Sequence, residues 1–268
     1  MPVSVRVYSG PHSDRGGGPT GWTAYIPWAF VALTILGQIL WVLVDGTARD
    51  VLTVLTVVTF FLASATHAWQ RRGAGWTAGF LGITLAFGWL IERIGLSTSL
   101  PFGEYAYHSG LGPSVFGVPL VVALAWSMMA YPVLVAAQRL STTGLGTALI
   151  GGWLLAAWDL FLDPQMVGEG YWTWADDSWS LPGIDGIPMQ NFVGWLLAAM
   201  ALMWILDRLP RKTAPVAVPT VMLTWVLASN VVGNLLFWGR PGVAIWGGLA
   251  MGIVVVPYLW RLWSTPQW

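Results

Sequence analysis

Long apolar segments separated by short polar ones make up most of this chain of 268 residues. A helix needs roughly 20 mostly apolar residues to cross the hydrocarbon core of a bilayer. Eight segments meet this requirement, and they predict an all-α, polytopic bundle of transmembrane helices. The sixth is short and the fourth contains two prolines, so seven spans remain an alternative. The segments cover about 25–44, 51–69, 76–94, 116–137, 144–162, 190–206, 216–238 and 242–262.

The rest of the chain leaves little room for a second domain. Residues 1–24 combine Gly16-Gly17-Gly18-Pro19 with scattered polar residues, which predicts a flexible tail rather than a cleavable signal sequence. Residues 25–268 contain no long polar stretch and are expected to form a single integral membrane domain. Charged residues make up 9% of the chain, against about 25% in soluble domains, which supports this interpretation.

Charge is distributed unequally between the two ends of an eight-span bundle. Nine of the twelve Lys and Arg residues fall on the side of the termini, and ten of the twelve carboxylates fall on the other side. Because cytoplasmic loops are rich in Lys and Arg, we expect cytoplasmic termini and a location in the plasma membrane. The long loops, about 95–115 and 163–189, then face outward. No basic cluster is interleaved with aromatic residues, so nucleic-acid binding is not expected.

Two carboxylates, Asp159 and Asp163, lie four residues apart at the end of the fifth apolar segment. This spacing places both on one helix face. An acid inside the membrane is costly and marks a functional site. Further polar residues are predicted at a similar depth, and we expect the group to converge on one pocket beneath the outer surface. They are Gln38, Glu92, Gln190, Asn191, Asn230 and Asn234.

Structural explanations for the same residues remain open. Asn and Gln in transmembrane helices often bind a neighbouring helix. Arg93 is a possible ion-pair partner for Glu92 or for Asp159. Asp163 precedes Pro164, where the helix is expected to end in water. For Asp159, the ion pair with Arg93 is the main structural explanation.

Tryptophan is unusually frequent, with 20 residues. Many lie at the ends of the apolar segments, where the ring anchors a helix at the headgroup level. Others lie near the acids, and their faces attract a cation by about 0.5–2 kcal/mol. We expect this second group to line a substrate site. Its members are Trp89, Trp153, Trp158, Trp172, Trp174 and Trp195.

Residues 171–195 form the second outward loop and combine several aromatic residues with Pro182, Pro188 and glycines. We predict that this loop folds back as a lid over the pocket. An ordinary interfacial loop is the alternative.

The inventory of reactive side chains excludes several enzyme classes. The chain has no Cys and three His, so neither a thiolate site nor a His-rich metal site is expected. The pair Asp159 and Asp163 resembles a magnesium–diphosphate motif only loosely, because the outward loops lack the basic partners. No metal ion is therefore expected.

Three groups of motifs lie within about 85–200. The first group is Glu92-Arg93-Ile94-Gly95, Pro101-Phe102-Gly103-Glu104-Tyr105-Ala106-Tyr107 and Gly117-Val118-Pro119-Leu120. The second is Gly151-Gly152-Trp153, Ala157-Trp158-Asp159-Leu160-Phe161-Leu162-Asp163-Pro164 and Gly170-Tyr171-Trp172-Thr173-Trp174. The third is Gly186-Ile187-Pro188-Met189-Gln190-Asn191-Phe192-Val193-Gly194-Trp195. Together these motifs resemble the integral-membrane carotenoid biosynthesis family, whose characterised members are carotenoid 1,2-hydratases that act on γ-carotene-type or bisanhydrobacterioruberin-type ends.

The resemblance implies a hydro-lyase that adds water to the terminal double bond of a carotenoid held in the bilayer, without a cofactor. The residue roles follow from the chemistry of this sequence. An acid kept protonated by an apolar site would start the reaction, and Asp159 is the first choice, ahead of Glu104 or Glu92. Water-holding candidates are Asp163, Asn191 and Asn234, and Asn230 joins the expected substrate-binding residues.

Two other functions remain open. An end-group cyclase begins with the same protonation but excludes water, so its product keeps the formula of the substrate. A membrane protein that binds lipid or carotenoid without catalysis would give no product. The sequence does not distinguish between oligomeric states.

Overall fold

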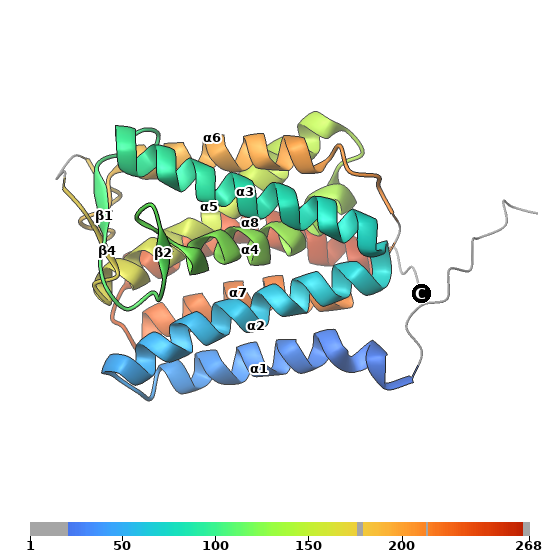
Figure 1. Cartoon of the computed structure of the whole chain (residues 1–268), viewed down its shortest axis with the longest axis horizontal. Coiled ribbons are helices and arrows are strands. Elements are labelled where there is room, and N and C mark those ends of the chain that lie inside the picture. The colour runs from blue at the N-terminus through green and yellow to red at the C-terminus, as the bar shows by residue number, and fades with distance from the viewer. Residues whose placement is uncertain (1–20, 176–178, 213, 265–268) are drawn as a thin grey trace, which may run out of the picture.

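Eight long helices, joined at one end by loops that carry four short strands, form the structure (Figure 1). This computed structural model describes residues 21–175, 179–212 and 214–264. Most of the expected N-terminal tail, residues 1–20, lies outside the described residues. The last part of that tail, Gly21–Tyr25, forms the short 3₁₀ helix η1.

All eight helices are long and apolar enough to cross a membrane, which confirms eight spans over seven and indicates a multi-pass membrane protein. The even number leaves the first and last described residues at the same end of the bundle (Figure 1). The helices are α1 Ile26–Trp41, α2 Gly46–Arg72, α3 Ala74–Thr98, α4 Leu120–Leu140, α5 Gly144–Gly168, α6 Met189–Leu206, α7 Ala217–Leu236 and α8 Pro241–Ser264.

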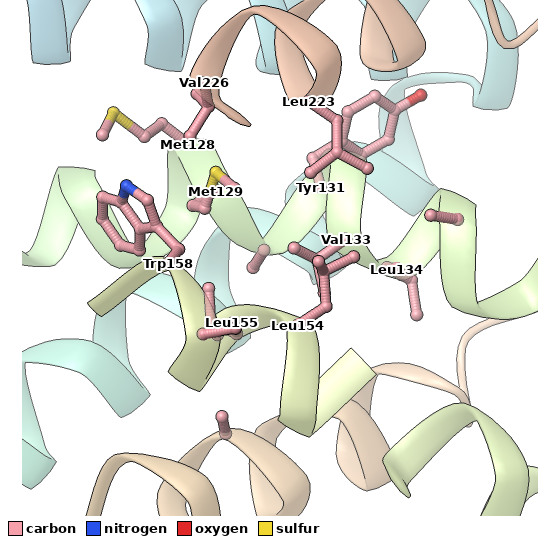
Figure 2. Close-up of a cluster of buried hydrophobic side chains, with 14 of the residues drawn as sticks. Met128, Met129, Tyr131, Val133, Leu134, Leu154, Leu155, Trp158, Leu223 and Val226 are labelled. Atoms are coloured by element: carbon pink, nitrogen blue, oxygen red, sulfur yellow. The ribbon is translucent and has the colours of Figure 1, made fainter. Parts of the chain in front are cut away.

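Helix α4 lies at the centre of the bundle, where it packs against α2, α3, α5 and α7. Figure 2 shows its side chains between those of α5 and α7. Met129, Val133 and Leu134 of α4 are fully buried, as are Leu154 of α5 and Leu223 of α7. A helix enclosed by protein on all sides is apolar all round, so hydropathy alone did not reveal which of its faces contacts which neighbour.

Helices α5 and α6 pack closely because glycine lies at their contact. A side chain at Gly152 would place its Cβ 2.8 Å from the Cα of Met200. Small residues permit such a close approach between membrane helices. This packing holds the polar ends of α5 and α6 next to each other.

Helix α5 extends further than its apolar segment predicted. It continues through Pro164 to Gly168, although an internal proline removes one backbone hydrogen bond. The last turn of the helix has a partner from outside, since Nη1 of Arg240 donates to the carbonyl of Pro164 at 2.8 Å. The alternative that Asp163 lies at a helix end in water is wrong, because Asp163 is only 3% exposed.

The outward loops join each other across one end of the bundle (Figure 1). Strand β1, Tyr105–Tyr107, pairs antiparallel with β4, Trp172–Trp174, so that Tyr105 lies opposite Trp174 and Tyr107 opposite Trp172. Strands β2, Ser114–Val115, and β3, Val118–Pro119, form a second small hairpin.

The loop after β4 also folds back onto the bundle, as predicted for a lid. Ile184 and Ile187 are buried against the helices, whereas Trp179 remains exposed. Residues 176–178 lie outside the described residues.

Candidate active site

A cavity of about 630 Å³ lies beneath the β1–β4 sheet. Helices α2 to α6 and both strands contribute to its wall. We call it the carboxylate cavity, because Glu92 of α3 and Asp163 of α5 both line it. Its other polar and aromatic lining residues include Asn191, Tyr105, Tyr107, Trp126, Trp172, Trp174 and Trp195.

Asn191 joins the two aspartates of α5. Its Nδ2 donates to Oδ2 of Asp159 at 3.0 Å and also to Oδ2 of Asp163. The Nε1 of Trp172 donates to the other oxygen of Asp163 at 3.2 Å. The remaining oxygen, Oδ1 of Asp159, is buried and accepts no hydrogen bond within the described part of the chain.

The position of Asn191 follows from where α6 begins. Pro188 is the N-cap of this helix and has an extended backbone, so Asn191 lies in the first helical turn. Its amide side chain thereby enters the bundle beside the end of α5. Asp159, Asp163 and Asn191 are exposed by 1–3% of their surfaces, so water does not screen their interactions.

Glu92 accepts three hydrogen bonds. The hydroxyls of Tyr105 and Tyr107 donate to its Oε2 at 2.6 and 2.8 Å, and Nε1 of Trp126 donates to its Oε1 at 3.1 Å. Hydrogen bonds to an ionised carboxylate are about twice as strong as those between neutral groups. Glu92 is therefore held in one orientation by a strand of the loop and by the central helix.

Both tyrosines remain hydrogen-bond donors over the physiological pH range. Burial, and then the negative charge of Glu92, raises the pKa of Tyr105 and the pKa of Tyr107 well above the ordinary value of 10.0. Residues two apart on a strand point to the same side, which directs both hydroxyls of β1 toward Glu92.

Aromatic rings form much of the remaining wall. Trp126 and Trp195 stack in parallel with their ring centroids 4.2 Å apart. Trp158 meets Trp195 edge-on at 6.1 Å, and Tyr107 meets Trp172 edge-on at 5.6 Å. The stacked rings fix one another, so this wall is rigid and carries a negative electrostatic potential at its ring faces.

A smaller cavity of about 290 Å³ lies beside the carboxylate cavity. Asp163 and Asn191 line both cavities, whereas Asp159 lines only the smaller one of the two. The loop that covers it contributes Leu181, Ile184 and Ile187. The aspartate pair thus lies between two hollow spaces.

Comparison with known proteins identifies the family. The model of the carotenoid biosynthesis protein family matches residues 51–259. The chain belongs to this family. It is also 31% identical over 126 residues to bisanhydrobacterioruberin hydratase of Haloarcula japonica, a match that covers 44% of this chain and 40% of that protein. No solved structure matches.

Family membership and the apolar helices together point to a carotenoid substrate within the membrane. A distant relative that is a hydratase points to a carotenoid-modifying enzyme. The match to this relative spans less than half of its length, so its activity and substrate are not carried over here.

In this member of the carotenoid biosynthesis family, many of the residues expected at the site lie together. They are Glu92, Asp159, Asp163, Asn191, Trp172, Trp174 and Trp195. Their convergence could not be derived from depth alone, because depth does not determine how each helix is rotated.

Other expected residues lie elsewhere. Glu104 is exposed just before β1 and does not line either cavity. Asn234 is buried in α7, where its Nδ2 donates to the carbonyl of Asn230. Trp153 donates to the carbonyl of Ala250 in α8 at 2.8 Å. Asn230 and Trp158 line a third cavity.

The alternative of an ion pair for Asp159 has no support in the structure. Among the described residues, the salt bridges join Arg49 to Asp45 and Glu169, and Arg211 to Asp207. Arg93 takes part in none of them. Neither Asp159 nor Asp163 therefore forms a salt bridge with a cationic side chain among the described residues.

Tyr105, Tyr107 and Trp126 were not among the expected site residues. The spacing of Tyr105 and Tyr107 contains a signal that both share one side of a strand. Trp126 had no comparable signal, since it lies within an apolar helix whose faces all look alike.

Proposed function

We propose that this protein is a carotenoid hydratase that adds water to the terminal 1,2 double bond of an acyclic ψ-end group. The product would be a tertiary alcohol. The observation that carries the proposal is the carboxylate cavity, where Asp163 of the aspartate pair and a separate glutamate line one aromatic-walled space. Hydration through a carbocation needs an acid, a base and a wall that tolerates positive charge.

The aspartate pair is proposed as the acid. Asp159 and Asp163 accept hydrogen bonds from the same amide nitrogen of Asn191, so their oxygens are close together. Two neighbouring carboxyl groups in a medium of low dielectric constant share a proton rather than both ionising. Asp163 is the member that lines the carboxylate cavity, and it would pass this proton to the less substituted carbon of the double bond.

Glu92 is proposed as the base. Its three hydrogen-bond donors hold the carboxyl group in one orientation, and Oε1, which accepts one bond from Trp126, retains a lone pair for a water molecule. Water would attack the tertiary cation and give a proton to Glu92. Return of that proton to the aspartate pair through water restores the enzyme, and the net change is the addition of one water.

The aromatic wall is proposed to stabilise the cation between these two steps. An aromatic face attracts a cation by about 2 kcal/mol or more where water is excluded. Trp126, Trp172 and Trp195 line the cavity with the two acids.

A cyclase is the second candidate, because ring closure begins with the same protonation. The smaller cavity favours hydration instead. It adjoins Asp159, whose Oδ1 accepts no hydrogen bond from the described residues, and a buried carboxyl oxygen of this kind is a suitable partner for water. A cyclase would be expected to exclude water beside its acid.

Expression in a lycopene-producing host would test the proposal, with the masses of the extracted pigments as the readout. Gain of one water by the wild type, but not by Asp163→Asn at equal membrane levels, would support hydration. A new pigment of unchanged formula would identify a cyclase. Unchanged pigment with lycopene and with other acyclic carotenoids would contradict an enzymatic role and favour a carrier.

A further inference from the structure

A third and larger cavity, of about 1,420 Å³, adjoins the carboxylate cavity. We call it the lateral groove. Its wall consists mainly of the outer halves of α1, α2, α5 and α7. Four residues line both spaces, namely Thr53, Val57, Leu162 and Met166. The two cavities are therefore neighbours that share one wall or passage.

The shared residues form a neck between α2 and α5. Thr53 and Val57 are four residues apart on α2, and Leu162 and Met166 are four apart on α5, so each pair lies on one helix face. Thr53 is tied down, because its hydroxyl accepts from Nε1 of Trp41 at 2.8 Å. Two helix faces with mostly apolar side chains thus separate the carboxyl groups from the lateral groove.

The lateral groove itself is apolar and aromatic. Phe60, Trp158 and Phe237 are among its lining residues. A polar group within it is already paired, since Nε1 of Trp225 donates to Oε1 of Gln38 at 2.6 Å. Other polar residues, among them Gln165, Ser229 and Asn230, also line the groove, but most of its wall is apolar and suited to a hydrocarbon.

The rim of the lateral groove faces the lipid. Four of its lining residues are exposed: Ile39 of α1, Leu43 just after α1, Val232 of α7 and Phe237 just after α7. They belong to helices that cross the membrane or to the residues directly after them. A ligand in the groove can therefore enter from the bilayer without passing through water.

We infer that the lateral groove binds the conjugated chain of a carotenoid, which enters sideways from the bilayer and passes its end group through the neck to Asp163 and Glu92. The inference rests on the proposed function for the identity of the end group. The four lining residues that the two cavities share, the mostly apolar lining and the exposed apolar rim supply the rest. The groove would then select elongated polyenes over short branched alkenes.

Filling the groove away from the acids tests this assignment. Ser229 of α7 lines the lateral groove and not the carboxylate cavity, so Ser229→Phe would place a ring in the path of the polyene. Ala228, the preceding residue, is exposed, and Ala228→Phe adds the same ring on the outside. Val42→Phe, at the end of α1, fills the groove from a second helix if Ser229→Phe does not fold.

The readout is pigment bound per protein after purification from a lycopene-producing host, measured by visible absorption. We expect Ser229→Phe or Val42→Phe to lower it by about tenfold or more, because overpacking an occupied site is costly, while Ala228→Phe matches the wild type. The inference would be overturned if a folded Ser229→Phe or Val42→Phe bound as much pigment as Ala228→Phe. A wild type that binds no pigment would also overturn it.

This readout is independent of catalysis. Pigment bound by the wild type without any hydrated product would contradict the proposed function but leave the groove assignment standing. A ten-carbon alkene with the same branched end lacks the long chain that would occupy the lateral groove. Its turnover should therefore be unchanged in Ser229→Phe, and a parallel loss would show that the substitution acts on the acids rather than on the groove.

Discussion

Asp159 and Asp163 share a helix face but differ in what they touch. Asp163 lines the carboxylate cavity and accepts from Trp172, whereas Asp159 adjoins the smaller cavity and is reached through Asn191. The sequence made Asp159 the more probable acid because Asp163 was expected in water. Both aspartates are buried, so burial does not show which of them donates the proton. Contact with the carboxylate cavity does distinguish them, and it favours Asp163.

Replacement of either aspartate by asparagine removes a transferable proton while keeping the size of the side chain. General acid catalysis contributes about 10²–10⁴-fold, so we expect Asp163→Asn to lower hydration by that factor. Asp159→Asn should lower it by a smaller or equal factor, because Asp163 still reaches the substrate. Single-turnover formation of hydrated carotenoid would measure both. Near-normal product from well-inserted Asp163→Asn would exclude it as the donor.

Arg93→Gln provides the matched control for these variants. Arg93 is half-buried on α3 next to Glu92 but does not line the carboxylate cavity. Its replacement should leave hydration and membrane insertion close to wild type. Loss of folded protein equal to that in Asp159→Asn would instead support an ion pair between the two residues.

The hydrogen bonds to Glu92 lead to a second prediction at this scale. Glu92→Gln should lower the rate by about 10²–10⁴-fold if Glu92 accepts the proton, beyond any loss of stability caused by its weakened hydrogen bonds. Tyr107→Phe removes one donor to a charged group, which costs about 1.5–3 kcal/mol, and should lower stability as well as rate. Thermal unfolding and single-turnover rates on both variants separate these effects. If Glu92→Gln failed to fold while Tyr107→Phe remained active, the role of Glu92 would be purely structural.

At the scale of single elements, hydropathy predicted every helix because eight runs of apolar residues have few alternatives in a membrane. It did not predict the end of α5, because a proline usually marks a helix end, whereas α5 continues through Pro164 to Gly168. Nor did it predict the pairing of β1 with β4, since strands of three residues carry too little periodicity. Thus the acids and Trp172 were found in the sequence, but Tyr105 and Tyr107, which orient Glu92, were not.

The β1–β4 sheet is expected to stabilise the outer loops and the site together. Trp172 is buried in β4 and donates to Asp163, whereas Trp179 of the same loop is exposed. Trp172→Ala should cost about 3–5 kcal/mol, lower activity and open the loop to protease. Trp179→Ala should change neither property by much. Limited proteolysis of the two variants side by side is the measurement, and equal sensitivity would contradict the role of β4 as a lid.

At the scale of the whole molecule, the strands lie at the end of the bundle away from the described termini (Figure 1), and residues of β1 and β4 line the carboxylate cavity. The excess of Lys and Arg at the other end predicts that the termini are cytoplasmic. Reporter fusions at the C-terminus and within residues 165–185 should therefore report opposite sides of the membrane. Reports from the same side would contradict the eight-span arrangement.

The single-ended arrangement of the site also determines the order of events on a long, symmetrical substrate. Glu92 and Asp163 line one cavity at one end of the bundle, so a linear polyene presents one terminus to them while the other remains remote. To react twice, the molecule must leave, turn over in the bilayer and return. A time course should then show singly hydrated pigment rising before the doubly hydrated form, because release and reversal separate the two additions.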